Sequence, residues 1–217
     1  MTESSPLDAT RASYDTVAAD YAVLLADMMP KKPYDNAVLA VFADIVTAGG
    51  GGRVGDLGCG PGHVTARLRD LGLTAFGIDL SPGMIAVARA TYPDLVFEEG
   101  SMTGLDLADG SLAGALAWYS LVHTPPEQLP GVFAEFHRVL APGGHLLVAF
   151  KVGDECVRLE QAYGHAVTLD VHRFVPDAVA GMLEEAGFRV RSRLVREADE
   201  WEKTPQAFFV MVKPPAP

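Results

Sequence analysis

The fold is decided by Val54-Gly55-Asp56-Leu57-Gly58-Cys59-Gly60-Pro61-Gly62, where a short apolar strand over residues 53–57 runs into three glycines at alternate positions. Glycines at a strand-to-helix turn let the backbone approach a ligand closely. A dinucleotide-binding fingerprint that begins at Gly58 needs a glycine at position 63, which is His63 here. A phosphate-binding P-loop needs Gly-Lys-Ser/Thr at the start of the helix, and no lysine is present there. The spacing therefore argues against both kinds of phosphate site.

Two carboxylates indicate a different ligand. Asp56 ends the strand beside the glycines, where an ionised carboxylate repels a pyrophosphate and favours a cationic group. Asp79 follows 23 residues later, after an expected strand over residues 74–78. In a parallel sheet this position lies beside the first turn, and a carboxylate there can accept two hydrogen bonds from a ribose diol. A ligand with a ribose, a positive charge and no phosphate is S-adenosylmethionine.

The rest of the chain alternates strands and helices. This alternation predicts an open, mostly parallel sheet with helices on both faces. Residues 151–175 interrupt the alternation and are expected to form an insertion over the site, and residues 1–9 are expected to be a polar tail. We expect the last two strands to pair antiparallel at the sheet edge. A helix with Val64, Leu68 and Leu71 inward is expected after the glycine turn, and the other expected helices cover residues 10–29, 34–48, 82–92, 129–140 and 176–186. The remaining strands cover 95–97, 113–118, 145–150, 188–195 and 207–212.

Five segments, taken in order, resemble the class I S-adenosylmethionine-dependent methyltransferases of the small-molecule branch. They are Tyr14-Asp15 with Tyr21, Asp56-Leu-Gly-Cys-Gly-Pro-Gly62, Gly77-Ile-Asp79-Leu-Ser81, Arg138-Val-Leu-Ala-Pro-Gly-Gly144 and Leu183-Glu-Glu-Ala-Gly-Phe188. The resemblance covers about residues 10–213. It implies an α/β, Rossmann-like, doubly wound sheet of seven strands, mostly parallel with an antiparallel last strand. It also places residues 1–217 in one methyltransferase domain, with residues 10–48 as an N-terminal helical cap.

The resemblance implies that the cofactor S-adenosylmethionine lies along the glycine turn. Gly58 and Gly60 would lie against its methionine part, and Asp79 would bind its ribose. Ser101 stands where the family often has an acidic residue that contacts the adenine amino group, so the match leaves the adenine contacts open. The predicted cofactor-binding residues are Asp56, Gly58, Cys59, Gly60, Asp79, Leu80, Ser101, Met102 and Trp118.

The acceptor side of the site is less constrained by the sequence. His123 follows an expected strand end, where an imidazole can take a proton from an acceptor, so it is the predicted catalytic residue. A histidine packed within the loop is an equally good interpretation. The methyl acceptor is expected to be a small molecule such as a secondary metabolite, methylated at O, N or C. Its predicted contacts are Tyr14, Tyr21, Tyr119, His165 and His172, although the aromatic residues also fit a packed core.

Composition limits the classes of partner. The 217 residues carry a formal net charge of −11, which argues against nucleic acid and anionic membranes as partners. The two cysteines form no CxxC pair and the six histidines show no metal-binding spacing, so no metal is expected. No long apolar run and no secretory signal are recognised, so a cytoplasmic location is expected. The sequence leaves open whether the protein is a monomer or a homodimer.

Two alternatives to a methyltransferase remain at this stage. A nicotinamide-dependent oxidoreductase shares the acidic residue at the strand end but needs the glycine that position 63 lacks. A non-catalytic module would bind S-adenosylmethionine without ever producing S-adenosylhomocysteine.

Overall fold

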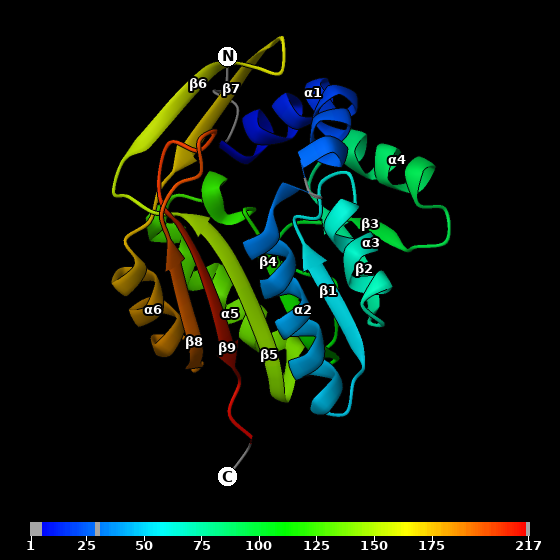
Figure 1. The fold of residues 1–217 in the computed structure, drawn as a ribbon, viewed down its shortest axis with the longest axis vertical. Coiled ribbons are helices and arrows are strands. Elements are labelled where there is room, and N and C mark those ends of the chain that lie inside the picture. The colour runs from blue at the N-terminus through cyan, green and yellow to red at the C-terminus, as the bar shows by residue number, and fades with distance from the viewer. Residues whose placement is uncertain (1–5, 29–30, 216–217) are drawn as a thin grey trace.

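A seven-stranded sheet forms the centre of the molecule, with strand order β3-β2-β1-β4-β5-β9-β8 (Figure 1). The computed structural model describes residues 6–28 and 31–215. Strands β1 to β5 run parallel, whereas β9 lies between β5 and β8 and is antiparallel to both. The predicted sheet, including its antiparallel last strand, is confirmed. The strands are β1 (Arg53–Leu57), β2 (Thr74–Asp79), β3 (Phe97–Glu99), β4 (Leu112–Trp118), β5 (Leu140–Lys151), β8 (Arg189–Arg196) and β9 (Gln206–Val212).

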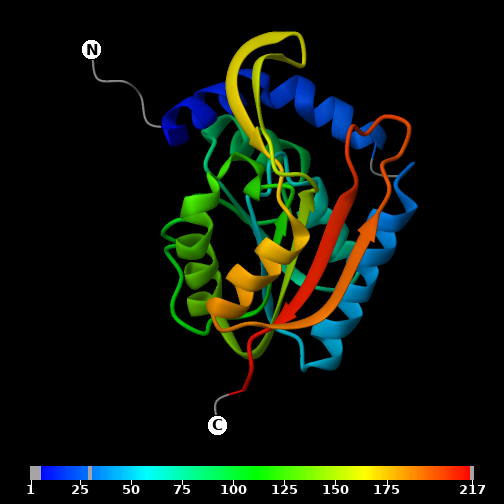
Figure 2. The same cartoon turned by 90° about the vertical axis from the view of Figure 1, so that its left-hand side faces the viewer.

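Helices cover both faces of this sheet. Figure 2 shows α5 (Leu129–Val139) and α6 (Pro176–Glu185) on one side and α2 (Pro33–Ala48) on the other. Helix α3 (His63–Asp70) packs on the same face as α2, and α4 (Pro82–Thr91) packs against β2 and β3. Two short 3-10 turns, η2 (Leu121–His123) and η3 (Pro126–Gln128), connect β4 to α5. The doubly wound arrangement follows from strands that are apolar on both faces.

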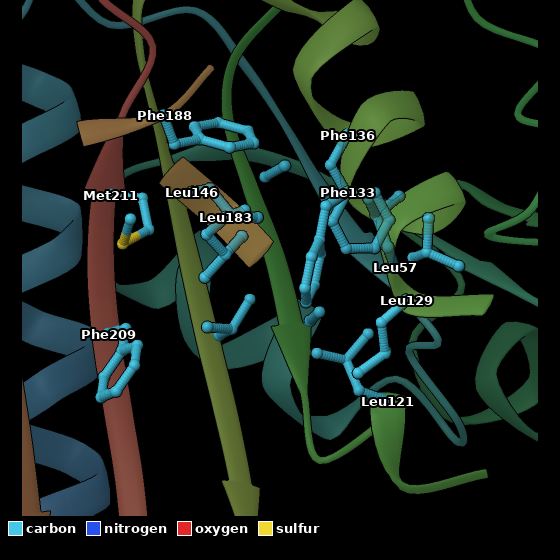
Figure 3. Close-up of a cluster of buried hydrophobic side chains, with 14 of the residues drawn as sticks. Leu57, Leu121, Leu129, Phe133, Phe136, Leu146, Leu183, Phe188, Phe209 and Met211 are labelled. Carbon is cyan, nitrogen blue, oxygen red and sulfur yellow. The ribbon is translucent and has the colours of Figure 1, made fainter. Parts of the chain in front are cut away.

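The core has two layers because successive side chains of a strand point to opposite faces. In β5, Leu146 faces α5 and α6, whereas Leu147 faces α2. Figure 3 shows Phe133 and Phe136 of α5 beside the sheet; their spacing puts both on one face of the helix. All four side chains are fully buried. The carboxyl ends of the strands are thereby fixed as a rigid edge.

Helix α1 (Pro6–Met28) and a separate hairpin lie over that edge, above the ends of β1, β4 and β5 (Figure 1). The hairpin consists of β6 (Cys156–Ala162) and β7 (His165–His172), which occupy the segment expected to be an insertion. Ser13 of α1 binds the backbone of Thr168 twice, accepting from its N–H at 3.0 Å and donating to its carbonyl at 3.2 Å. Of the two helices expected over residues 10–48, α1 covers the strand ends, whereas α2 packs on the sheet.

Several boundaries differ from the sequence prediction. Helix α1 begins at Pro6, within the expected polar tail, because proline suits the first turn of a helix. Strand β3 begins at Phe97 rather than at residue 95, since Leu95 closes a turn onto Tyr92. Strand β5 begins at Leu140, before Pro142-Gly143-Gly144, because Leu140 pairs with β4 ahead of a register shift. Residues 1–5 of the expected tail and residue 29 of the expected helix lie outside the described residues.

Candidate active site

Two adjoining cavities lie under α1, one enclosing about 120 Å³ and the other about 440 Å³. The first cavity is lined by the glycine turn, the end of β2 and the residues after β3. The second cavity is lined by α1, the hairpin, the end of β5 and the connection between β8 and β9. The cavities share four lining residues, namely Tyr14, Tyr21, Tyr119 and His123. We call these four residues the junction.

The glycine turn has a conformation that only glycine adopts easily. Gly58 and Gly60 have φ angles of 79° and 53°, in the left-handed region. A Cβ at Gly58 would overlap the Cβ of Ser120, whose hydroxyl donates to the Leu57 carbonyl at 2.7 Å. At Gly60 the nearest atom outside the turn is a ring carbon of Tyr21, 3.9 Å from where a Cβ would lie. Gly58 therefore lets the turn pack closely against Ser120, whereas Gly60 leaves the backbone bare toward the first cavity.

Asp79 ties the end of β2 to this turn. Its Oδ2 accepts the Gly60 N–H at 2.7 Å, and its Oδ1 accepts the Ser81 N–H at 2.9 Å. Burial raises the pKa of Asp79, although these backbone hydrogen bonds lower it. An ionised carboxylate accepts about four hydrogen bonds, so two positions remain for the hydroxyls of a diol. The carbonyl of the next residue, Leu80, accepts from Arg11 Nε at 3.0 Å, which holds α1 at the rim.

Asp56 is a buried carboxylate with one free oxygen. Its Oδ2 accepts the Thr65 hydroxyl at 2.7 Å, while its Oδ1 has no hydrogen-bond partner within residues 6–28 and 31–215. Burial raises the pKa of Asp56 from its usual 3.8 to about 7. Because Asp56 lines the first cavity, a cationic group placed there would be attracted to this carboxylate.

The other predicted cofactor-binding residues, Cys59, Ser101, Met102 and Trp118, also line the first cavity. Burial raises the pKa of the Cys59 thiol well above its usual value, so this residue is a small neutral part of the wall. Ser101 shares a hydrogen bond with the Thr103 hydroxyl at 2.8 Å.

Sequence reasoning missed several residues of the first cavity, including two with basic side chains. Arg11 and His63 both line it, and burial lowers the pKa of His63 to about 4. The position of His63, directly after Gly62 and at the start of α3, was the only signal for its presence in the site.

His123 forms a defined hydrogen-bond chain at the junction. Its Nδ1 lies 2.8 Å from the Asp170 carbonyl, and its Nε2 lies 2.7 Å from the Tyr14 hydroxyl. A carbonyl can only accept, so Nδ1 carries the proton and the neutral ring accepts the Tyr14 O–H at Nε2. Burial lowers the pKa of His123 to about 4 and raises the pKa of Tyr14. Near neutral pH the pair is therefore a neutral imidazole and a neutral phenol.

The other junction residues are aromatic. Tyr21 packs edge-on against Tyr14, with ring centroids 5.9 Å apart. Tyr119 has a φ of 54°, and its ring packs edge-on against Trp118 at 5.6 Å. The Tyr119 hydroxyl is buried and has no hydrogen-bond partner among the residues that the structure describes. The junction thus consists of three tyrosine rings and one neutral imidazole between the two cavities.

The structure places the two predicted acceptor histidines of the hairpin elsewhere. Neither His165 nor His172 is among the described residues that line the two cavities. His165 Nε2 lies 2.7 Å from an Asp20 carboxylate oxygen and thereby connects the hairpin to α1. The ring of His172 stacks on Phe174, with centroids 6.3 Å apart. These contacts give both residues a role in holding the hairpin.

In the described part of the chain, no group of three or more His, Cys, Asp or Glu residues is arranged to hold a metal ion. None of the described helices is both long enough and apolar enough to cross a membrane.

Comparison with known proteins finds a methyltransferase domain in the central part of the chain. Residues 54–144 match the family model of a methyltransferase domain. A demethylmenaquinone methyltransferase of Renibacterium salmoninarum is 34% identical over 151 residues, covering 64% of this chain and 62% of that protein. A malonyl-[acyl-carrier protein] O-methyltransferase of Erwinia billingiae is 31% identical over 141 residues, covering 64% and 55%. The chain thus matches less than two thirds of the length of either relative.

Two solved structures share the fold. Magnesium protoporphyrin IX methyltransferase of Synechocystis, with bound S-adenosylmethionine, has a TM-score of 0.72 at 13% identity, covering 98% of this chain and 99% of that one. A 1,6-didemethyltoxoflavin-N1-methyltransferase of Burkholderia thailandensis has a TM-score of 0.70 at 19% identity, covering 95% and 88%. The matched segment includes the glycine turn and both carboxylates, so residues 54–144 match a methyltransferase domain and the chain has the fold of S-adenosylmethionine-dependent methyltransferases.

Proposed function

We propose that this protein transfers a methyl group from S-adenosylmethionine to an O, N or C atom of a small molecule. The observation that carries the proposal is the meeting of two cavities at the junction, with the glycine turn and Asp79 forming the wall of the first. The first cavity would hold the cofactor and the second the acceptor. This arrangement brings the two reactants together over the carboxyl ends of the strands, where ligands bind in folds of this class.

The residues of the first cavity fit this cofactor. The turn at Gly58 and Gly60 accommodates its methionine part, and the two free positions on Asp79 suit the ribose hydroxyls. The free oxygen of Asp56 suits its positive charge. Ser101 and Met102 line the part of the cavity left for the adenine. The cofactor supplies an activated methyl group, so the main tasks of the chain are positioning and the exclusion of water.

Tyr14 and His123 would handle the proton of an acceptor. A hydroxyl placed beside the Tyr14 oxygen can pass its proton to Tyr14 while Tyr14 passes its own to His123 Nε2. An imidazole whose pKa is lowered to about 4 is a weak base. It suffices here because an oxygen that gains a methyl group becomes strongly acidic. We therefore propose His123 as the catalytic residue, acting through Tyr14.

The cellular location and the partners follow from the same proposal. Cys59 and Cys156 are both free, which suits the reducing cytoplasm that we propose. We propose no nucleic acid as partner, because the net charge is −11.

Isothermal titration calorimetry with the Asp79→Ala variant tests the cofactor assignment. We expect affinity for S-adenosylmethionine to fall roughly 100-fold or more, because two charge-assisted hydrogen bonds are lost. Asp94→Ala, which removes an exposed carboxylate, is the matched control and should bind as the wild type does. Unchanged affinity in Asp79→Ala would show that the ribose binds elsewhere. A protein that binds S-adenosylmethionine but converts no small-molecule acceptor would be a binding module instead.

A further inference from the structure

Positive charge gathers around the second cavity, although the chain as a whole carries −11. The described residues that line this cavity include four cationic side chains and a single carboxylate. The cations are Lys32, Lys151, Arg173 and Lys203, and the carboxylate is Glu202. Such a local reversal of charge is the pattern expected where an anion binds.

The carboxylate does not neutralise the cavity, because it is already engaged outside it. Arg196 binds both oxygens of Glu202, at 2.6 and 2.8 Å. Lys32 lies farther away, 3.7 Å from Glu202 Oε1 and 3.9 Å from the buried Asp35. Glu202 is thus shared between Arg196 and Lys32, and neither Lys151 nor Lys203 has an ion pair among the described residues.

Among these cations, Lys203 is exposed, and the half-buried cation without an ion pair to any described residue is Lys151. It is the last residue of β5 and is half-buried, and its ammonium forms no hydrogen bond or ion pair with any residue that the structure describes. By contrast, Arg173 has an ion pair with Glu155 at 2.8 Å. Burial lowers the pKa of Lys151, and the charges of Arg173 and Lys32 act in the same direction. An unpaired, half-buried ammonium is destabilising by itself, so its presence is best explained by a ligand.

The rest of the lining determines what kind of anion fits. Most of the other residues of the second cavity are apolar or aromatic. They come from α1, the hairpin and the connection before β9, and include Leu25, Met28, Leu159, Leu169 and Trp201. A cavity of about 440 Å³ with such walls suits a ligand with an apolar body larger than a simple ion.

We propose that the methyl acceptor is a small-molecule acid, in which an apolar body carries a carboxylate that Lys151 binds. This inference rests on the proposed function, since it names the class of acceptor for the same reaction. The carboxylate serves to hold the acceptor, and the atom that receives the methyl group lies at the junction. Lys151 is thus a residue that determines specificity for the acceptor.

The test compares acids with their neutral amides. We would saturate the protein with S-adenosylhomocysteine and measure the binding of 2-naphthoate, 2-naphthamide, 4-phenylbutyrate and 4-phenylbutanamide by calorimetry. In the wild type, we expect at least one acid to bind roughly ten-fold or more tightly than its amide, because a charge-assisted contact is lost in the amide. Lys151→Met should reduce this preference to about threefold or less.

Two controls separate binding from structure. Arg69→Met removes one positive charge from the exposed surface of α3 and should keep the preference for acids. Lys151→Met should bind S-adenosylhomocysteine as the wild type does and should melt at the same or a higher temperature, because an unpaired ammonium is removed.

Three results would overturn the inference. The first is that the wild type prefers neither acid over its amide, or binds neither acid. The second is that the preference for an acid persists in Lys151→Met. The third is that Arg69→Met loses the preference as fully as Lys151→Met does. If these occur while S-adenosylhomocysteine binds the wild type, the proposed function stands and only the class of acceptor is wrong. If S-adenosylhomocysteine does not bind, the proposed function and this inference fall together.

Discussion

Replacing Asp56 by Asn should make the protein more stable at high pH while weakening its binding of a cationic ligand. Burial raises the pKa of Asp56 from 3.8 to about 7, so the folded state holds this proton more tightly than the unfolded state. The contribution of this proton to the free energy of unfolding is complete below about pH 4, decreases as the pH rises and is lost above about pH 7. Asn stays neutral throughout, and its amide oxygen can still accept the Thr65 hydroxyl.

The size of the effect follows from the shift. Between pH 5 and the pKa near 7, the wild type loses stability over about two pH units, and it loses little more by pH 8. The free energy of unfolding of Asp56→Asn, relative to that of the wild type, should therefore rise by on the order of 3 kcal/mol between pH 5 and pH 8. Urea denaturation at both pH values measures it. His63 and His123 titrate alike in both proteins and cancel in the difference. Asp94→Asn, an exposed substitution, should show no such change.

Binding of S-adenosylmethionine provides the second readout. A cationic group beside Asp56 favours the ionised carboxylate, so binding near pH 7 should release roughly half a proton. Calorimetry in phosphate and in Tris, two buffers with different ionisation enthalpies, measures this release. Asp56→Asn should release none and should bind more weakly. Equal proton release by both proteins, or a pH-independent stability difference, would refute the reasoning.

Three further predictions test other parts of the site. Tyr14→Phe and His123→Ala should each lower kcat on a hydroxyl acceptor roughly 10²- to 10⁴-fold with unchanged cofactor affinity. The double variant should be no slower than either single variant, because the proposed proton transfer needs both groups. Gly58→Ala should lower the free energy of unfolding, measured by urea denaturation, by roughly 2–4 kcal/mol. Adding Ser120→Gly should recover the cost of the clash with the Ser120 side chain but not the cost of the positive φ angle. Ser13→Ala should lower it by about 1–3 kcal/mol and speed hydrogen exchange in β7, because two hydrogen bonds to the hairpin are lost.

The fold was largely predictable from the sequence because its signals are local. The glycines after β1 and the capping Ser81 before Pro82 fix where strands end and helices begin. The order of strands in the sheet then follows from the handedness of parallel connections. The errors fell at element ends, such as Leu140, where pairing with a distant strand overrides the local Pro-Gly-Gly signal.

The acceptor side could not be predicted because it is made by contacts between distant segments. Tyr14 and His123 are 109 residues apart, and the Asp170 carbonyl that orients the imidazole comes from a third segment. Nothing in the sequence near Lys151 indicates that its ammonium lacks a partner, since that depends on where the carboxylates of other elements point. The same dependence misled the prediction for His165, whose partner Asp20 lies on α1.

Helix α1 shows how a single helix assembles both halves of the site. Successive residues of a helix project about 100° apart, so three consecutive side chains face three different directions. Ser13 binds the backbone of β7, Tyr14 reaches the junction, and the Asp15 carboxylate accepts the Ser81 hydroxyl and the Gly83 N–H at the start of α4, at 2.6 and 2.8 Å. Ser13 holds the hairpin that walls the second cavity, and Asp15 binds the segment that follows Asp79. Between them, Tyr14 lies where the two cavities meet, so displacing α1 would open both cavities and break the hydrogen bond between Tyr14 and His123 together.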